Sequence, residues 1–230
     1  LIALPAATIF FPLSVSWKWG GGWLETLGNT YDFAGSALVH WHVGSVALVL
    51  GLVLTLHRRQ KSGSIDEEES RVALPGQAAL LVGGILYFLA LVGFNAGSAL
   101  TAEPAIVAPV VEATLIAGAI SGGIGILWGV VSPGFPVVRF LVLGAVAGAV
   151  VVSGGADLLD RRESIVLGLL SGILIPGLIF LSDRIGWFDP LSVGAVHGVG
   201  GFIGPQLFGT IHDTTGSYHP MMLLAMAIGV

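Results

Sequence analysis

Long apolar runs alternate with short polar segments along almost the whole chain. Six of these runs approach or exceed the roughly 20 residues that a helix needs to cross the hydrocarbon core of a membrane. They cover residues 33–56, 74–100, 105–131, 138–155, 165–181 and 192–211. Shorter apolar runs lie at residues 1–15 and 221–230. The pattern predicts an all-α polytopic membrane protein.

Composition narrows the class of protein further. Mean hydropathy is +0.92 and only 10% of residues are charged, against about 25% in an ordinary soluble domain. The chain has no cysteine, which excludes disulfides, thiolate metal sites and a cysteine nucleophile. Its sequence shows no basic patch for nucleic acid and no nucleophile constellation, metal-ligand cluster or nucleotide loop. We therefore expect a multi-pass protein of the cell membrane that contacts the lipid bilayer, is not an enzyme, uses no cofactor and binds no nucleic acid.

The two ends of the chain look incomplete. The first residue is not methionine and the first apolar run has no positively charged segment before it, so this run is not a signal peptide. Each terminal run is shorter than a full span. We expect the sequence to be a fragment of a longer protein, in which residues 1–230 form a single transmembrane domain with a partial span at each end.

Two histidines lie inside predicted spans in the same local frame, which consists of an aspartate, a histidine eight residues later and a glycine four residues after that. The frame occurs at Asp32, His40 and Gly44 and again at Asp189, His197 and Gly201. An imidazole in hydrocarbon is costly and indicates a functional site. Eight helical residues rise about 12 Å, so both histidines approach the centre of a core about 30 Å thick. Because the two spans run in opposite directions, the pattern predicts an inverted repeat with one shared site; the alternative is that each histidine only bonds to a neighbouring helix.

Basic residues predict how the spans are oriented. One side of the predicted spans carries Arg58, Arg59, Lys61, Arg71, Arg139 and Arg184, and the other carries Lys18, Arg161 and Arg162. The positive-inside rule places the richer side in the cytoplasm.

Glycine-rich segments follow one another along the chain in a definite order. They read WGGG at residues 19–22, DFAG at 32–35 before His40, GFNAGS at 93–98 and, after Asp189, VHGVGG at 196–201. Together they resemble the ammonium transporter (Amt/Rh) family, over residues 16–209. A single glycine-rich segment would be weak evidence, whereas four in the family order are specific.

This resemblance implies a fold and an assembly. Family members have about eleven spans, built as two inverted halves of five helices and a last helix. The present chain would begin late in the fourth span and stop early in the eleventh, so the first spans would lie outside it. Members form homotrimers with a pore through each protomer, and we expect the same here, with a cytoplasmic regulatory protein as a further candidate partner.

By resemblance, three residues belong to the outer part of a pathway for ammonium or ammonia. Trp19 would lie in the outer vestibule, where an indole face attracts a cation by about 1 to 2 kcal/mol, and Ser98 would accept a hydrogen bond from the same ion. Phe94 would be one of two stacked gate phenylalanines. Taken without the resemblance, Trp19 is better explained as a membrane-interface residue.

The resemblance places the two histidines below this gate. His40 and His197 would line the pore with their rings bonded to each other, and would offer ammonia an acceptor and a proton relay. Two such rings cannot both be charged at low cost in a narrow apolar pore. Asp32 would support the outer site by ordering backbone amides and adding negative potential, although a plain helix N-cap could be its whole role.

Two positions depart from the family pattern. Ser192 stands five residues before His197, where members usually carry an acid, so the bonding that supports this helix must differ. Glu112 lies inside the third predicted span, where members more often carry an amide. We expect Glu112 to be protonated and bonded to a neighbouring helix; the alternative is a role in the pore.

Three functions stay open at this point. The leading one is a transporter or channel for ammonium or ammonia, with a hydrophobic pore lined by the twin histidines. The second is an ammonium sensor that uses the same fold and signals through an attached domain. The third is a Rh-like conduit for a neutral gas, which a cation-capturing Trp19 disfavours.

Overall fold

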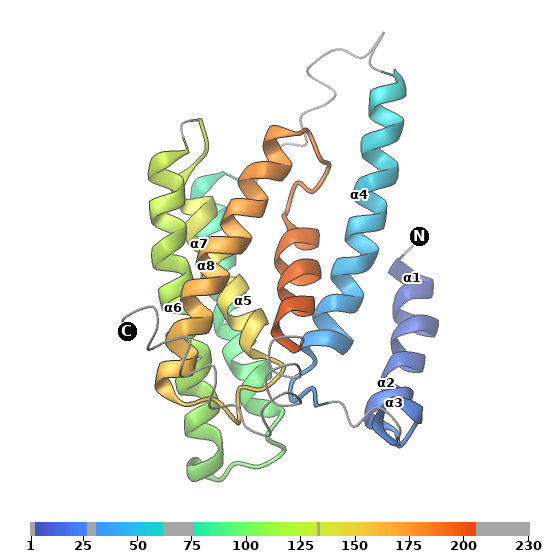
Figure 1. The fold of residues 1–230 in the computed structure, drawn as a ribbon, viewed down its shortest axis with the longest axis vertical. Helices are drawn as coiled ribbons and strands as arrows, with labels where there is room; N and C mark the ends of the chain where they lie inside the picture. Colours follow the sequence, from blue (N-terminus) through green and yellow to red (C-terminus); the bar gives the residue numbers. More distant parts are fainter. Residues whose placement is uncertain (1–2, 27–30, 62–75, 133, 206–230) are drawn as a thin grey trace.

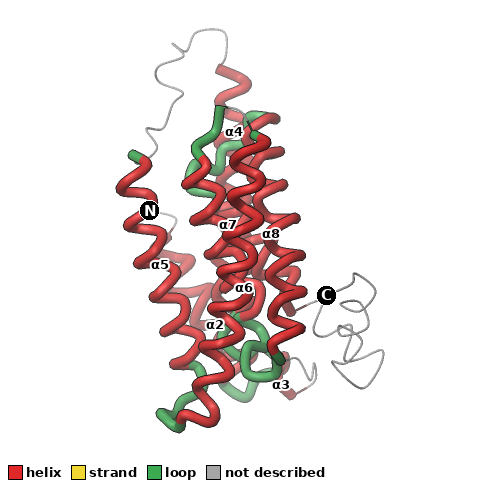
Figure 2. The backbone as a smooth tube through the Cα atoms, turned by 90° about the vertical axis from the view of Figure 1, so that its left-hand side faces the viewer, coloured by secondary structure: helices red, strands yellow, loops and turns green. Residues whose placement is uncertain are grey.

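The computed structural model describes residues 3–26, 31–61, 76–132 and 134–205. Every regular element in these ranges is helical, and the long helices run side by side as a bundle (Figures 1 and 2). The predicted all-α fold class is therefore confirmed. The predicted run at residues 221–230, the C-terminal part of the sixth span and Arg71 lie outside the described residues.

The helical elements include three π-helical segments, named η. In chain order the elements are α1 (Ala3–Pro5), η1 (Ala6–Phe10), α2 (Phe11–Trp19), α3 (Trp23–Thr26), η2 (Ser36–Trp41), α4 (His42–Lys61), α5 (Gln77–Gly97), α6 (Pro104–Val131), α7 (Val137–Val152), α8 (Arg161–Arg184) and η3 (Gly194–Val199). Helical backbone continues beyond η3 to residue 205.

Four of the helical segments are long and apolar enough to cross a membrane. They are Ser36–Gln60, Gln77–Gly97, Pro104–Val131 and Arg161–Arg184. The shorter α7 has 16 residues, most of them buried among its neighbours. The predicted spans at 33–56, 74–100, 105–131, 138–155 and 165–181 thus correspond to helices, with their ends shifted by a few residues.

The centre of the bundle is built from α6, α7 and α8, with α5 packed against α6 and α7 (Figure 1). One face of α6 carries small buried residues: Ala113, Ala117, Gly118, Ser121, Gly122 and Gly125. Small residues let helices approach closely. Such close packing holds helices together in a membrane, because lipid is as apolar as the side chains and leaves no hydrophobic driving force between helices. The wholly buried Asn95 of α5 donates to Thr114 Oγ1 at 3.1 Å and to the Ala149 carbonyl at 3.3 Å. These bonds tie α5 to α6 and α7.

The start of α8 lies four residues before the fifth predicted span. Asp160 accepts a hydrogen bond from the Glu163 amide at 2.8 Å, and the Glu163 carboxylate accepts one from the Asp160 amide at 2.9 Å. This reciprocal pair is a capping box, which satisfies amides that the first helical turn leaves without partners. Arg161 and Arg162 therefore lie in the first turn of the helix and not in a loop.

Polar contacts join segments at the two ends of the bundle. At the end where α4 and α8 both finish, Arg59 donates to the Ile185 carbonyl at 3.0 Å (Figure 1). At the other end the Tyr31 hydroxyl donates to the carboxylate of Asp157. Four of the described residues that the orientation argument assigned to the cytoplasm lie at the first of these ends, where α4 and α8 finish and α7 begins: Arg58, Arg59, Arg139 and Arg184. Which membrane face this end occupies stays a prediction.

Residues 3–19 form one continuous helix at the edge of the bundle, beside α4 (Figure 1). Most of its side chains are exposed. The ring of Phe11 meets the ring of His42 edge-on, with their centroids 6.0 Å apart. The apolar run predicted at residues 1–15 is helical over its described part.

Candidate functional site

His40 and His197 each lie in a π-helical turn. η2 (Ser36–Trp41) carries the first histidine and η3 (Gly194–Val199) carries the second. Such turns are rare and frequently occur at functional sites. Both rings are buried, with 4% and 8% of the residues' surface exposed. Two local irregularities, in segments 157 residues apart, therefore present the same kind of side chain to the interior.

The two imidazole rings are in direct contact. The Nδ1 atoms of His40 and His197 lie 3.1 Å apart, within hydrogen-bonding distance. The ring centroids are 5.0 Å apart and the ring planes are inclined by 31°. One proton can lie between the two nitrogens, so one ring donates and the other accepts. The structure thus brings together the two histidines that the repeated frame singled out.

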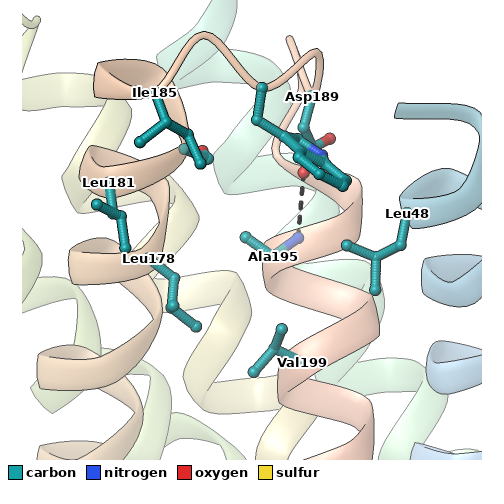
Figure 3. Close-up of a pocket in the computed structure, with 9 residues that line it drawn as sticks. Leu48, Leu178, Leu181, Ile185, Asp189, Ala195 and Val199 are labelled. Carbon is teal, nitrogen blue, oxygen red and sulfur yellow. Dashed lines mark hydrogen bonds between the residues drawn. The ribbon is translucent and has the colours of Figure 1, made fainter. Parts of the chain in front are cut away.

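The aspartates of the frame hold the start of each π-helical turn. Asp32 Oδ2 accepts from the amides of Ala37 at 3.1 Å and Leu38 at 3.0 Å. Asp189 Oδ2 accepts from the amide of Ala195 at 3.1 Å, the dashed bond in Figure 3. Both carboxylates therefore satisfy backbone donors that open a helix, as an N-cap does.

The glycines of the frame let the two helical segments touch. A Cβ atom placed on Gly44 would lie 1.9 Å from the amide nitrogen of Gly198, beside His197. A Cβ atom placed on Gly201 would lie 2.5 Å from the amide nitrogen of Trp41, beside His40. Each glycine thus packs on the backbone next to the opposite histidine. This reciprocal arrangement fits the predicted inverted repeat and brings the rings within reach of each other.

Burial changes the acidity of both frame aspartates. Burial raises the pKa of the Asp32 carboxyl to about 6, although its bonds to backbone amides and the nearby Lys18 charge oppose the rise. Burial also raises the pKa of Asp189, against the same kind of backbone bonds and the charge of Arg139. The aspartates are therefore buried structural groups, in keeping with the supporting role expected for Asp32.

Side chains from other helices complete the surroundings of the histidine pair. His40 Nε2 lies 3.4 Å from Ser153 Oγ, just after α7, and His197 Nε2 lies 3.2 Å from the Tyr87 hydroxyl on α5. Phe94 of α5 lies beside His40 with ring centroids 5.9 Å apart. Every imidazole nitrogen of the pair thus has a polar neighbour. The predicted gate residue Phe94 is in contact with the pair.

The two residues expected to recruit the ion lie near one end of the bundle. Trp19 ends α2, is 44% exposed, and donates from Nε1 to the Asp32 carbonyl at 3.2 Å. Ser98 follows α5 and donates to the Phe94 carbonyl at 3.1 Å. The structure brings Trp19 to Asp32, but no contact within the described residues joins Trp19 to Ser98. Their shared ion site stays a prediction.

A model of the Ammonium Transporter Family matches residues 1–223 of the chain. The chain belongs to the ammonium transporter family. The family pattern therefore runs through the described helices and includes both histidine frames. Curated relatives of the chain are named as ammonium transporters, in agreement with the expectation of a transport protein.

Curated relatives of this ammonium transporter family chain are about one-third identical to it. The ammonium transporter of Bacillus subtilis is 32% identical over 212 residues, which cover 91% of this chain and 49% of the relative. Amt1 of Archaeoglobus fulgidus is 33% identical over 214 residues, which cover 92% and 51% respectively. The chain thus spans about half the length of the curated relatives it matches.

Solved structures of ammonium transporter proteins share the fold. A protein described as a sensor Amt protein superposes with a TM-score of 0.74 at 26% identity, covering 88% of this chain and 51% of the other. Mep2 of Candida albicans superposes with a TM-score of 0.70 at 25% identity, covering 96% and 52%. With four helices able to cross a membrane, the chain is an integral, multi-pass membrane protein with the ammonium transporter fold.

Two departures from the family pattern have structural explanations. Ser192 Oγ accepts from Arg139 Nη2 at 3.0 Å, and the same buried guanidinium forms an ion pair with the partly exposed Asp183. The acid that serves this region therefore comes from α8. Glu112 was expected to be protonated, but it accepts from Arg161 Nε at 2.7 Å and is 45% exposed in its side chain. The expected bond to a neighbouring helix is therefore present, and its partner is Arg161 of α8.

A cavity of about 160 Å³ opens at the Asp189 end of η3. Figure 3 shows its mostly aliphatic wall, with Leu48, Leu178, Leu181, Ile185 and Val199 directed inward from three segments. Asp189 lies at its rim, where its bond to Ala195 is made.

Sequence reasoning missed the two hydroxyl groups beside the histidine pair. Ser153 falls inside the fourth predicted span and Tyr87 inside the second, and neither was selected. Tyr87 did carry a signal, because it precedes Phe94 by seven residues. A spacing of seven puts both side chains on one face of a helix.

Proposed function

We propose that the protein conducts ammonium across the membrane along a path that passes the His40 and His197 pair. The observation that carries this proposal is the 3.1 Å contact between two buried imidazoles in a chain of the ammonium transporter family. In the proposed path the ion sheds its water before it reaches the pair and crosses the apolar centre as ammonia. The protein is then a transporter or channel for ammonium and not an enzyme.

The chemistry of the pair supports this path. Dehydrating a compact cation in apolar surroundings costs several kcal/mol or more, whereas neutral ammonia needs only a partner for its hydrogen bonds. Two imidazoles joined through one hydrogen leave one bare nitrogen outside that bond, which can accept a hydrogen bond inside an apolar core or take up a proton. The burial of both rings keeps this chemistry away from bulk water.

Capture and gating are assigned to residues on one side of the pair. Trp19 and Ser98 attract the cation at the outer end, and the half-exposed Trp19 indole is available for a cation–π contact. Phe94, which touches His40, acts as the gate above the pair. Asp32 holds the first turn of η2 in place. The protein works as a homotrimer with one such path in each protomer.

Uptake of radiolabelled methylammonium tests this function. The product of the complete open reading frame that encodes this chain is reconstituted in vesicles, together with His40→Ala and the matched control His42→Ala. His42 is the neighbouring imidazole, but it packs on Phe11. We expect the His40 variant to lose at least about 90% of uptake, a change of about 1.4 kcal/mol or more, and the His42 variant to keep it. Equal uptake by all three proteins would refute the pathway.

A second candidate function is ammonium sensing. It is supported by the likeness to the protein described as a sensor Amt protein, with a TM-score of 0.74. A sensor would bind methylammonium or ammonium without carrying it at a comparable rate. Binding measured by calorimetry, with no uptake in the same vesicles, would favour sensing over transport.

A further inference from the structure

We propose that Tyr87 is a positioning residue of the histidine pair: its hydroxyl donates to His197 Nε2 and fixes which nitrogens of both rings carry hydrogen. The inference rests on the proposed function, since it assigns a role within the same pathway. Tyr87 lies on α5 and is 45% exposed. A tyrosine in an apolar span is costly unless its hydroxyl has a partner.

The position of Tyr87 mirrors that of Phe94 across the pair. The Tyr87 ring lies 5.9 Å from the His197 ring, edge to face, and the Phe94 ring lies 5.9 Å from the His40 ring. Seven residues of helix separate the two aromatic side chains by about 10 Å along α5. The helix thus places one aromatic ring beside each histidine. Because Phe94 is on the His40 side, Tyr87 borders the other side of the pair.

The direction of hydrogen bonding is set at Ser153. The Ser153 hydroxyl lies 2.8 Å from the Ala149 carbonyl, one helical turn back, and 3.4 Å from His40 Nε2. A hydroxyl has one hydrogen, and the shorter contact with the carbonyl takes it. Ser153 Oγ can then only accept from His40, so His40 carries its hydrogen on Nε2.

The remaining assignments follow along the chain of contacts. A neutral imidazole has one N–H and one bare nitrogen, so His40 Nδ1 is bare and accepts from Nδ1–H of His197 across 3.1 Å. The Nε2 atom of His197 is then bare as well. It needs a donor, and the Tyr87 hydroxyl lies 3.2 Å away. Hydrogen bonds therefore run in one direction, from Tyr87 through both rings to Ser153 and the Ala149 carbonyl.

This direction changes what a molecule in the pathway meets. The bare nitrogen of His197 is occupied by the tyrosine hydroxyl, so the acceptor on that side is the phenol oxygen, which keeps a free lone pair. Removing the hydroxyl leaves a bare buried nitrogen, a costly state unless water or substrate takes the vacant place. Tyr87 thus selects a small hydrogen-bond donor, such as ammonia, at the side of the pair away from Phe94.

The first test reads the hydrogen positions directly. Solid-state nitrogen-15 NMR of histidine-labelled protein in bilayers distinguishes a protonated from a bare ring nitrogen, with signals assigned through single histidine variants. We expect Nδ1–H on His197 and Nε2–H on His40 in the parent protein. In Tyr87→Phe the ratio of the Nδ1–H form to the Nε2–H form of His197 should fall by about three- to tenfold, the worth of one hydrogen bond. Nε2–H on His197 in the parent would overturn the assignment.

The second test separates positioning from capture. We expect Tyr87→Phe to lower the maximal rate of methylammonium uptake by about three- to tenfold while the half-saturating concentration changes by less than about twofold, since Trp19 is untouched. The matched control is Tyr31→Phe, which removes the hydroxyl that bonds to Asp157 and should leave the histidine signals unchanged. An unchanged maximal rate in Tyr87→Phe would overturn the role of the hydroxyl.

The two tests distinguish a failure of the inference about Tyr87 from a failure of the proposed function. If the parent protein carries no methylammonium, the proposed function fails, and the NMR signals alone still confirm or refute the hydrogen positions. If the parent carries methylammonium and Tyr87→Phe shows neither effect, the pathway stands and the inference is wrong.

Discussion

Adding one methyl group at Gly44 should break the histidine pair without touching either ring. The Cβ of Gly44→Ala would meet the backbone of Gly198 at 1.9 Å from nitrogen and 2.1 Å from Cα. Backbone atoms cannot turn away as a flexible side chain can. The segments that carry His40 and His197 must therefore move apart.

The size of this movement can be worked out from the contact. Ordinary van der Waals contact begins near 3.4 Å, so the segments must separate by about 1.5 Å at this point. If the rings follow their backbones, the Nδ1 atoms move from 3.1 Å to more than 4 Å apart, beyond hydrogen-bonding distance. Overpacking of this kind costs about 1–3 kcal/mol, and sometimes more. We expect Gly44→Ala to lower stability by this amount and to lose most uptake.

Two measurements in detergent and vesicles check this prediction. Thermal unfolding, monitored by size-exclusion chromatography of heated samples, reports stability. Methylammonium uptake reports function. Gly123→Ala on α6 is the matched control, because a Cβ there would have no neighbour within 4 Å. In a helix this exchange is neutral or stabilising by up to about 1 kcal/mol. Normal stability and uptake in Gly44→Ala would refute the reasoning that the close crossing positions the pair.

Three further predictions concern the outer end and the buried charges. Trp19→Ala should raise the half-saturating concentration for methylammonium by about five- to thirtyfold, from a lost cation–π contact of about 1–2 kcal/mol, with little change in maximal rate in uptake assays. Because the pKa of Asp32 is raised to about 6, its contribution to stability is greatest below pH 4 and is lost as the pH rises through 6. Asp32→Asn should therefore reduce the change in melting temperature between pH 4 and pH 7. Arg139→Met should cost about 1–3 kcal/mol, because it leaves the partly buried Asp183 without its partner, and adding Asp183→Asn should restore most of the melting temperature.

The helices themselves were readable because polar residues bound each apolar run. Their ends were less certain, since an apolar pattern does not show where hydrogen bonding begins. The start of α8 at Arg161 is an example: Asp160 and Glu163 have the spacing of a capping box, yet their charges favoured a loop at first sight. The interior α7 is shorter than its predicted span, with 16 residues at Val137–Val152 against the predicted 138–155.

The histidine pair could be predicted because its frame repeats. Asp32 and Asp189 each precede their histidine by eight residues, in two segments that run in opposite directions. This repeated spacing can be read from the sequence alone. The π-helical turns could not be predicted, since one extra residue in a turn leaves no clear mark on hydrophobic spacing. Tyr87 was missed for a different reason: its partner lies 110 residues away in the chain. Contacts between distant residues of different types need the packed structure.

Glu112 shows how the start of one helix decides the partner of a residue on another. From its place within an apolar run, a bond to a neighbouring helix was the expectation, but the partner could not be named. The early start of α8 brings Arg161 alongside Glu112 and leaves the pair partly exposed.

The central claim is that ammonium passes a bonded pair made by His40 and His197, and one electrical measurement tests it most directly. Current is recorded on a solid-supported membrane after a jump in ammonium and, separately, in potassium. The parent protein and a variant in which both histidines are replaced by aspartate are compared. We predict a current with ammonium but not potassium in the parent, and a current with both ions in the variant, whose acidic pore would admit water and no longer require ammonia. Equal ion selectivity in the two proteins, or an electrically silent parent that still takes up methylammonium, would contradict the account.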